Sequence, residues 1–382
     1  MTFFIYFGES QTMAFEDVCV FTGHDGVNTG VPDEIAPLIE KHIPDPENGI
    51  FFSDFDGCLS PDDFGITCFF EKLHNGEYWK WSPKQFSKLL LPTQKTNNNI
   101  VSYSKLIKFA IANNGIDPKI KERAKKLQNL QEKLNILYVQ IQTETSPGLR
   151  NKFAKKMLEF DELILSLEEF FMPFFGNQIF SRLRFFAGKS HTDAKNLAAT
   201  TIEKGKLRIN KDLFYIYENL KKNGAEGRII STNLMSFIRE AVRITILSDI
   251  FSEQDVHATK MRGTRGKGNE ALRYQNLISG EPVFGTRKAQ ILKQEIVEKE
   301  KKNILSVGDS TSSDGTMLAE SLKSGGSNII VVPENADVAK VAKIFESRLA
   351  QCLEVQQLTE EQKQRMWYLQ SKNFVDSRRI TT

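Results

Sequence analysis

Short apolar runs alternate with amphipathic stretches through the second half of the chain. Four of these runs have the length of buried strands: residues 228–231, 255–259, 303–307 and 328–332. Between them, the spacing of the apolar residues predicts helices over residues 235–247, 286–300 and 315–323. Strands that alternate with helices in this way indicate βαβ units. We therefore predict a parallel sheet and an α/β fold class.

An earlier apolar run, residues 50–53, predicts one more buried strand of the same sheet. From residue 64 to residue 204 the pattern is helical instead, with leucines spaced by three or four residues at Leu127, Leu130, Leu134 and Leu137. Within this stretch, Asp117 and Pro118 are suited to be a helix N-cap and a first helical residue. The stretch is therefore predicted to be mostly α-helical.

The order of these regions predicts the domains. Residues 49–63 and 205–350 are expected to form a core that is discontinuous in sequence, with residues 64–204 inserted into it as an α-helical cap. Residues 1–48 are expected to be an N-terminal extension with one strand and one helix. The polar residues 351–382 are expected to form a C-terminal helical tail.

The composition is that of an ordinary folded protein. The chain has 382 residues, of which 40% are hydrophobic and 26% charged, so collagen-like and wholly disordered classes are excluded and two or three domains are allowed. The formal net charge is only +3, and no nucleic-acid partner is expected. The charge is uneven, however: −12 over residues 1–63, +9 over residues 64–204 and +6 over residues 205–382. Such different segments are expected to have different roles.

The same composition bears on the compartment. The four cysteines form no Cys-x-x-Cys pair, so neither a disulfide framework nor a zinc site is indicated. No run of eighteen apolar residues is present, so no membrane span is expected. The apolar patch at residues 3–7 lacks the basic flank of a signal peptide. We predict a soluble cytoplasmic protein, with export as an effector without a cleavable signal peptide as the alternative.

Acidic residues follow two of the predicted strands at the point where the strand ends. Asp54 and Asp56 directly follow the run of residues 50–53, and Asp309 and Asp314 follow a later strand. In an open parallel sheet the carboxyl ends of the strands meet at one edge, and ligands bind there. Carboxylates gathered at this edge would repel one another strongly unless a cation lay among them. A donor set made only of oxygens indicates Mg²⁺.

Hydroxyl, amide and ammonium groups accompany these acids. Ser231, Thr232 and Asn233 follow the next strand, and Lys288 lies at the start of a predicted helix. A hydroxyl donates a hydrogen bond to a phosphoryl oxygen, and an ammonium group neutralises the charge that develops as phosphorus is attacked. Two aspartates separated by one residue can divide the work between a nucleophile and a general acid and base. The set therefore predicts metal-assisted phosphoryl transfer.

In this order and in these strand contexts, the motifs resemble those of the haloacid dehalogenase-like (HAD) superfamily of phosphohydrolases. The first motif is similar to residues 51–59, the second to 230–233, the third to Lys288 and the fourth to 307–314. Residues 280–288 resemble the phosphoserine phosphatase-like branch of that superfamily. The resemblance implies a Rossmann-like parallel core with an inserted cap.

The resemblance also implies a role for each site residue. Asp54 would be the nucleophile that forms an aspartyl-phosphate, and Asp56 would protonate the leaving group and then activate water. The residues that would bind phosphate are Ser231, Thr232, Asn233 and Lys288. The residues that would hold Mg²⁺ are Asp54, Asp56 through its backbone carbonyl, Asp309 and Asp314.

Three positions bear on how far the family pattern extends. Cys58 stands where Thr or Ser is usual. Asp63 lies nine residues past the nucleophile, where phosphoserine phosphatases have an acid that meets the substrate's amino group, although Asp62 and Asp63 also fit a turn or helix cap. Arg184 in the cap would contact a substrate carboxylate or phosphate, or would be an ordinary solvated helix residue. The substrate is not fixed by these positions.

The function predicted from the sequence is a Mg²⁺-dependent phosphatase acting on a phosphomonoester, either a small molecule or a phosphoprotein. Two alternatives stay open. One is an interaction protein or bacterial effector that binds a partner through the basic cap. The other is a phosphotransferase, because the core residues do not distinguish water from another acceptor.

Overall fold

The computed structural model describes residues 19–22, 45–74, 82–91, 93–95, 100–144, 146–167, 170–171, 186, 189–264, 273–370 and 373–378. The chain divides into two compact units. The first unit comprises Met1–Phe64, Ala198–Thr259 and Val283–Thr382, and the second comprises Gly65–Leu197 and Lys260–Pro282. The second unit therefore contains residues 260–282, which the sequence pattern assigns to the core.

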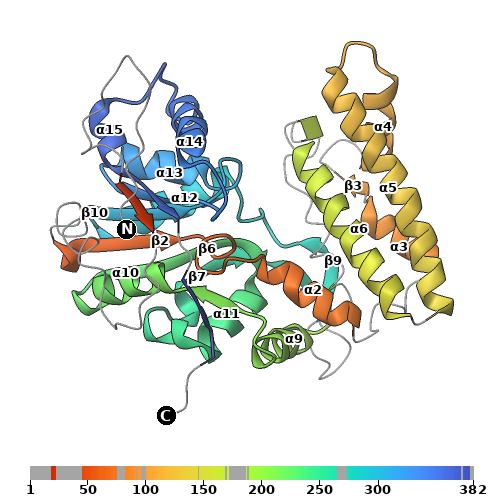
Figure 1. Cartoon of the computed structure of the whole chain (residues 1–382), viewed down its shortest axis with the longest axis horizontal. Coiled ribbons are helices and arrows are strands. Elements are labelled where there is room, and N and C mark those ends of the chain that lie inside the picture. The colour runs from red at the N-terminus through yellow and green to blue at the C-terminus, as the bar shows by residue number, and fades with distance from the viewer. Residues whose placement is uncertain are drawn as a thin grey trace. The chain divides into compact units, whose positions relative to one another are not determined.

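A parallel sheet forms the centre of the first unit. In the described ranges it has seven strands in the order β1-β12-β11-β10-β2-β6-β7, and every neighbouring pair is parallel. The strands are β1 (Cys19–Thr22), β2 (Gly49–Ser53), β6 (Glu226–Leu234), β7 (Val256–Thr259), β10 (Asn303–Gly308), β11 (Ser327–Val331) and β12 (Met366–Gln370). The predicted α/β class with a parallel sheet is confirmed (Figure 1).

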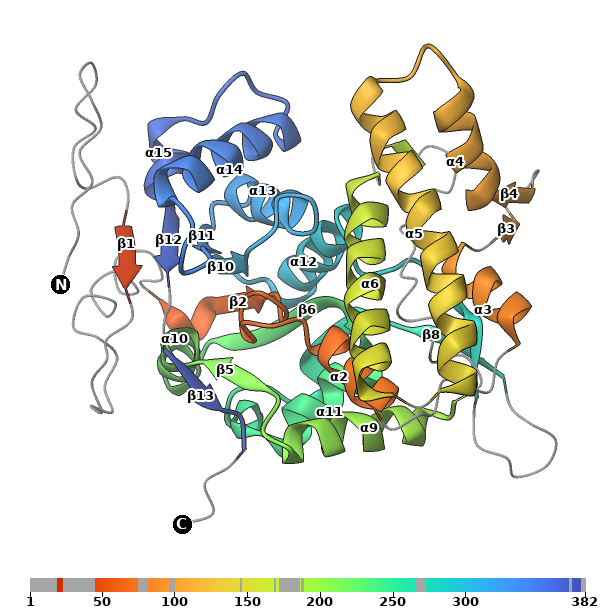
Figure 2. The same cartoon turned by 45° about the vertical axis from the view of Figure 1, so that its right-hand side comes forward.

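Helices cover both faces of this sheet, as the two views in Figures 1 and 2 show. One face carries α12 (Thr286–Lys299), α13 (Gly315–Lys323) and α14 (Val338–Cys352), and the other carries α10 (Lys211–Lys222) and α11 (Met235–Ile244). Side chains of β2 alternate between the faces. Phe52 joins the buried cluster that includes Met317 of α13, whereas Phe51 stacks on Tyr217 of α10 with ring centroids 4.8 Å apart. Because both faces are covered, all five residues of β2 are buried.

The C-terminal region differs from the prediction. The helical tail expected over residues 351–382 is wrong: beyond α14 the described residues contain one short helix, α15 (Glu360–Gln364), and then β12 lies inside the sheet between β11 and β1. The last strand, β13 (Phe374–Asp376), pairs antiparallel with β5 (Arg208–Asn210). A four-residue apolar run within a polar stretch gives a weak local signal. Its place in the sheet depends on pairing with strands that are distant in sequence.

The N-terminal extension contributes to the same sheet. The strand expected in residues 1–48 is β1, at the edge beside β12, and the helix expected there lies outside the described residues. The described residues of the first unit also contain the short 3₁₀ turns η1 (Pro46–Asn48), η3 (Ile246–Asp249) and η4 (Glu253–Asp255).

The second unit is mainly helical. Its described elements include α3 (Pro83–Leu90), α4 (Tyr103–Ala112), α5 (Pro118–Thr143) and α6 (Pro147–Ser166), with the hairpins β3 (Thr93–Lys95) to β4 (Ile100–Ser102) and β8 (Met261–Thr264) to β9 (Arg273–Ile278). Helices α2 (Phe64–His74) and α9 (His191–Glu203) carry the chain between the two units. The four spaced leucines of α5 are buried, and the Asp117 carboxylate accepts a hydrogen bond from the backbone N–H of Lys119 at 2.7 Å. The predicted helix start is confirmed.

The 260–282 stretch is tied to the second unit by its own contacts. The backbone N–H of Tyr274 in β9 donates to the carbonyl of Lys189 at 2.9 Å, and the Tyr274 hydroxyl lies 2.9 Å from the His191 ring nitrogen. No helix in the described ranges is both long and apolar enough to cross a lipid bilayer.

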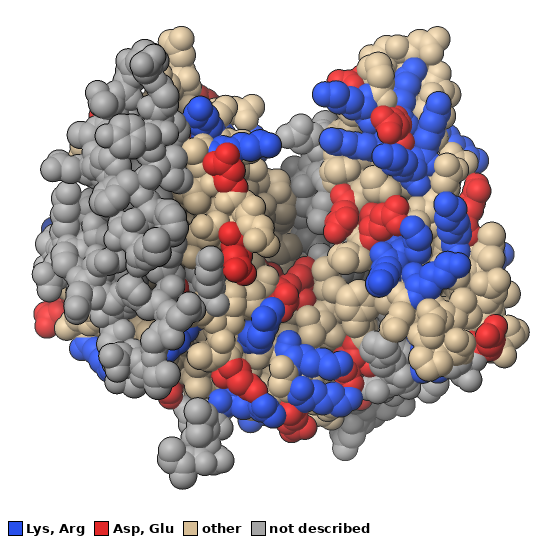
Figure 3. Space-filling model, viewed as in Figure 1, with Lys and Arg blue, Asp and Glu red and all other residues tan. Residues whose placement is uncertain are grey.

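Lys and Arg side chains are frequent on the surface of α5 and α6 (Figure 3). The exposed ones include Lys119, Arg123, Lys125, Lys126, Lys133, Lys152 and Lys155. Acidic residues lie among them: Glu122 pairs with Lys126 at 3.3 Å, and Glu159 pairs with Lys156. The positive charge of residues 64–204 is therefore displayed on these helices and partly balanced by local ion pairs, which contribute little to stability.

Candidate active site

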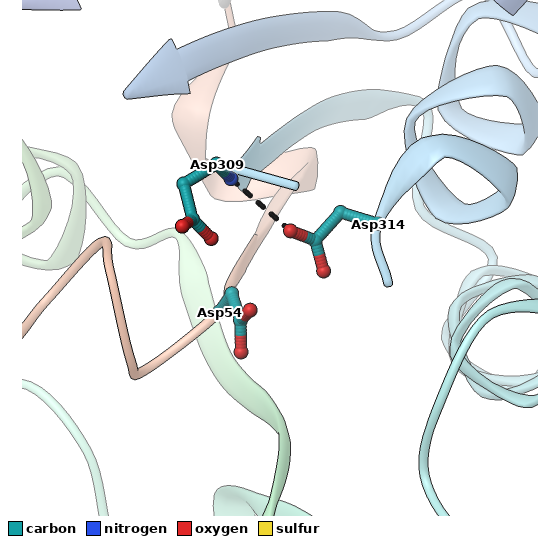
Figure 4. A group of neighbouring side chains, drawn as sticks. All are labelled: Asp54, Asp309 and Asp314. Carbon is teal, nitrogen blue, oxygen red and sulfur yellow. Dashed lines mark hydrogen bonds between the residues drawn. The ribbon is translucent and has the colours of Figure 1, made fainter. Parts of the chain in front are cut away.

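Three aspartates gather at the carboxyl end of the sheet (Figure 4). Asp54 directly follows β2, Asp309 follows β10, and Asp314 precedes α13. One carboxylate oxygen of each lies within 4.8 Å of the others. Strands β2 and β10 are neighbours, and the backbone N–H of Asp54 donates to the Val307 carbonyl at 3.0 Å. The strand pairing itself therefore brings Asp54 and Asp309 to the same edge.

The Asp314 carboxylate is held by the backbone of the loop that follows β10. One of its oxygens accepts hydrogen bonds from the backbone N–H groups of Asp309 at 3.1 Å and Ser310 at 3.0 Å. Gly308 leaves room for this arrangement, because a β-carbon there would lie 2.6 Å from the β-carbon of Asp314. The loop is therefore closed around Asp314, whose other oxygen faces Lys288.

Lys288 in the first turn of α12 is the cation of this cluster. Its Nζ lies 2.9 Å from Asp54 Oδ2 and 2.6 Å from Asp314 Oδ1, and its side chain is fully buried. Burial by itself lowers the pKa of a lysine, but the Asp314 and Asp54 carboxylates outweigh it and raise the pKa of Lys288 above its usual value. The ammonium group is therefore charged at neutral pH.

Among the described side chains of this cluster, three carboxylates share one lysine. Burial raises the pKa of Asp54 well above its usual value, and Asp314 and Asp309 raise it further while Lys288 opposes them. Burial, assisted by the Asp314 charge, likewise raises the pKa of Asp309 to about 8. A divalent cation would offset this repulsion, and oxygen donors suit Mg²⁺. The residues present therefore fit a magnesium ion held by Asp54, Asp309 and Asp314.

The loop after Asp54 is shaped around Asp309. Gly57 has a φ of +81°, and a β-carbon there would lie 2.1 Å from an Asp309 carboxylate oxygen. Cys58 Sγ lies 3.8 Å from Asp309 Oδ1, and burial, assisted by the Asp309 charge, raises the pKa of the thiol. The thiol therefore stays protonated and donates to Asp309. This role of Gly57 is not among the predictions made from the sequence, although its place in the Asp-x-Asp-Gly motif is a signal for one.

Asp56 has a different set of partners. Its Oδ1 accepts a hydrogen bond from the backbone N–H of Phe64 at 2.7 Å, and its Oδ2 accepts one from Asn233 Nδ2 at 3.1 Å. Asn233 Nδ2 also lies 3.5 Å from Asp63 Oδ1. The structure therefore gathers Asp56, Asp63 and Asn233 into one hydrogen-bonded group. Of these, Asp56 lies two residues after Asp54 in the chain.

Ser231 and Thr232 lie near the end of β6, the strand beside β2. Ser231 is fully buried, and its Oγ accepts a hydrogen bond from the backbone N–H of Asn233 at 3.0 Å. Thr232 Oγ1 lies 3.3 Å from Ser313 Oγ, a contact that the sequence does not predict. Both hydroxyls are thus on the strand adjacent to the one that ends in Asp54. Arg184, the proposed substrate contact, lies outside the described residues.

Replacing Lys288 with methionine is expected to lower the free energy of unfolding by about 3–5 kcal/mol, because it leaves the buried Asp54 and Asp314 carboxylates without their ammonium partner. Denaturant titration in EDTA measures this effect, and added Mg²⁺ is expected to recover part of it. Lys293→Met, at an exposed position of the same helix, is the matched control and is expected to change stability by less than about 0.5 kcal/mol. Equal stability of the two variants would contradict the pairing.

The known proteins that resemble this chain do so in their three-dimensional structures. No family model matches the chain, and no curated protein sequence matches it. A solved structure of a conserved protein of unknown function from Anaerococcus prevotii is similar with a TM-score of 0.50 and 14% identity, over 83% of this chain and 90% of that one. Cytosolic 5'-nucleotidase IIIB bound to cytidine is similar with a TM-score of 0.39 and 14% identity, over 85% of this chain and 91% of that one. A HAD family hydrolase from Salmonella enterica serovar Typhi is similar with a TM-score of 0.37 and 13% identity, over 78% of this chain and 70% of that one.

The first unit has a Rossmann-like α/β fold. A parallel sheet with helices on both faces carries the four polar motifs at the carboxyl ends of β2, β6 and β10 and in the first turn of α12, in the order that the sequence resemblance implies. A shared fold leaves the reaction to be argued from the site itself.

Proposed function

We propose that this protein hydrolyses phosphomonoesters, small molecules or phosphoproteins, through an aspartyl-phosphate on Asp54 with the help of Mg²⁺. The observation that carries the proposal is the environment of the Asp54 carboxylate. It lies 2.9 Å from the Lys288 ammonium group and within 4.8 Å of oxygens of Asp309 and Asp314. A carboxylate nucleophile, a group that neutralises phosphate and a set of cation ligands therefore coincide.

In the first step, an Asp54 oxygen attacks phosphorus, and the bond from phosphorus to the leaving alcohol oxygen breaks. That oxygen takes the electron pair and receives a proton from the Asp56 carboxyl group. Lys288 neutralises charge on the transferring phosphoryl group, and the Ser231 and Thr232 hydroxyls donate hydrogen bonds to its oxygens. Mg²⁺, when bound, supplies further positive charge at the phosphoryl oxygens.

In the second step, the Asp56 carboxylate accepts a proton from water as the water oxygen attacks the phosphorus of the aspartyl-phosphate. The bond between phosphorus and the Asp54 oxygen breaks, which releases inorganic phosphate and regenerates both carboxyl groups in their starting forms. The same group thus serves first as acid and then as base, and no other proton carrier is needed.

Hydrolysis is expected to require a divalent cation. Treatment with EDTA followed by dialysis is expected to lower the rate by about 100-fold or more, and Mg²⁺ is expected to restore it, because the three neighbouring carboxylates otherwise repel the anionic substrate. Phosphate release from a panel of phosphorylated metabolites and phosphopeptides measures this. Mg²⁺ is also expected to raise the Tm of the wild type but not of Asp309→Asn. Hydrolysis that continues at full rate in EDTA would contradict the proposal.

A further inference from the structure

Asn233 has a fixed orientation at the end of β6. It is only 7% exposed, its backbone N–H donates to Ser231 Oγ at 3.0 Å, and its side-chain Oδ1 accepts a hydrogen bond from the backbone N–H of Leu234 at 2.7 Å. The register between β6 and β7 shifts between Ser231 and Leu234, so this part of the strand is free of regular ladder pairing. Since Oδ1 is engaged by a backbone donor, the amide nitrogen is the end of the side chain that faces the acids.

The Asp56 carboxylate receives one N–H donor on each oxygen. Asn233 Nδ2 lies 3.1 Å from Oδ2, and the backbone N–H of Phe64 lies 2.7 Å from Oδ1. Two donors on the two oxygens define both the position and the plane of the carboxylate. A carboxylate oxygen has two lone pairs, and each of these two bonds engages one of them.

We infer that Asn233 is a positioning residue for Asp56 rather than a phosphate ligand. The inference rests on the proposed function and extends it by assigning the amide to the general acid. Between Asn233 and Phe64, Asn233 is the donor that can be exchanged by substitution, because Phe64 donates through its backbone. The longer contact of the same amide with Asp63, at 3.5 Å, adds a second carboxylate that keeps Nδ2 on this side.

A displaced general acid matters most when the leaving group needs a proton. Phenolate is a poorer leaving group than p-nitrophenolate, while phenyl phosphate and p-nitrophenyl phosphate have nearly the same shape and the same phosphoryl group. Removal of Asn233 is therefore expected to lower kcat/KM about 10- to 100-fold for phenyl phosphate and less than about threefold for p-nitrophenyl phosphate. Loss of a phosphate ligand would lower both equally.

The test compares wild type, Asn233→Ala and the isosteric Asn233→Asp across a series of substituted phenyl phosphates in Mg²⁺. Both variants are expected to steepen the dependence of kcat/KM on leaving-group basicity. In an Asp56→Ala background, Asn233→Ala is expected to cause no further loss on p-nitrophenyl phosphate. Asn328→Ala is the matched control, since this buried amide bonds the Leu318 carbonyl at 2.9 Å, and its removal is expected to lower the Tm without changing the leaving-group dependence.

Equal losses on all esters, or a further loss in the Asp56→Ala background, would overturn the positioning role. If the wild type hydrolyses none of the esters, the proposed function fails, and the contact is judged by thermal unfolding of the same single and double variants. Non-additive changes in Tm for Asn233→Ala and Asp56→Ala would then support an interaction between the two side chains, whereas additive changes would exclude it.

Discussion

Asp54→Asn is expected to abolish phosphomonoester hydrolysis, with a loss of about 10⁴-fold or more in kcat, because the carboxamide is not a nucleophile for phosphorus and no aspartyl-phosphate can form. The substitution is not expected to lower the stability of the fold. Burial and the neighbouring carboxylates raise the pKa of Asp54, so the folded state disfavours its ionised form, and stability falls as the pH rises through the range between the unfolded and folded pKa values. A neutral carboxamide removes that cost.

The measurement combines phosphate release, acid-quench trapping of phosphorylated protein and Tm in EDTA at neutral pH. Asp62→Asn is the matched control, because Asp62 is an exposed acid of the same loop, paired with Arg208 at 2.9 Å on the surface, and its loss is expected to change kcat less than about twofold. Activity in Asp54→Asn above one per cent of wild type would exclude Asp54 as the nucleophile.

The part of the site that lies at strand ends follows from the sequence. Asp54 ends an apolar run that is buried on both faces, and Asp309 ends a second run that pairs with it, so their meeting needs only parallel pairing. Lys288 and Asp314 join them because each lies at or just before the start of a helix that follows a strand or loop at the same edge. These positions depend on local pattern and on one rule of topology, which is why their convergence could be expected.

Other features depend on contacts that no local pattern encodes. The strand β12 is a short apolar run in a polar stretch, and it enters the sheet through pairing with β11 and β1. The strands β8 and β9 form an antiparallel hairpin, and the stretch that contains them belongs to the second unit. Asn233 belongs to a motif that suggests phosphate binding, yet its amide bonds Asp56 across a large separation in sequence. The sequence places such residues near the site without showing which way they face.

Gly57→Ala is expected to weaken the metal site as strongly as loss of a ligand. A β-carbon at position 57 would lie 2.1 Å from one Asp309 carboxylate oxygen and 2.9 Å from the other, so the carboxylate must move. Because changes in groups that only orient metal ligands already cost about 10- to 100-fold in affinity or activity, displacing the ligand itself is expected to raise the Mg²⁺ concentration for half-maximal activity about 100-fold or more. Titration of phosphate release with Mg²⁺ measures this shift.

The positive φ of Gly57 makes a second contribution, and Gly325→Ala separates it from the contact with Asp309. Gly325 has a φ of +79°, nearly equal to the +81° of Gly57, but among the described residues its β-carbon would meet only the Arg365 side chain, at 3.5 Å. Both alanine variants are expected to lose about 1–2 kcal/mol of stability from the left-handed backbone. Only Gly57→Ala is expected to shift the Mg²⁺ requirement, and an equal shift in both variants would show that general destabilisation, rather than the position of Asp309, controls metal binding.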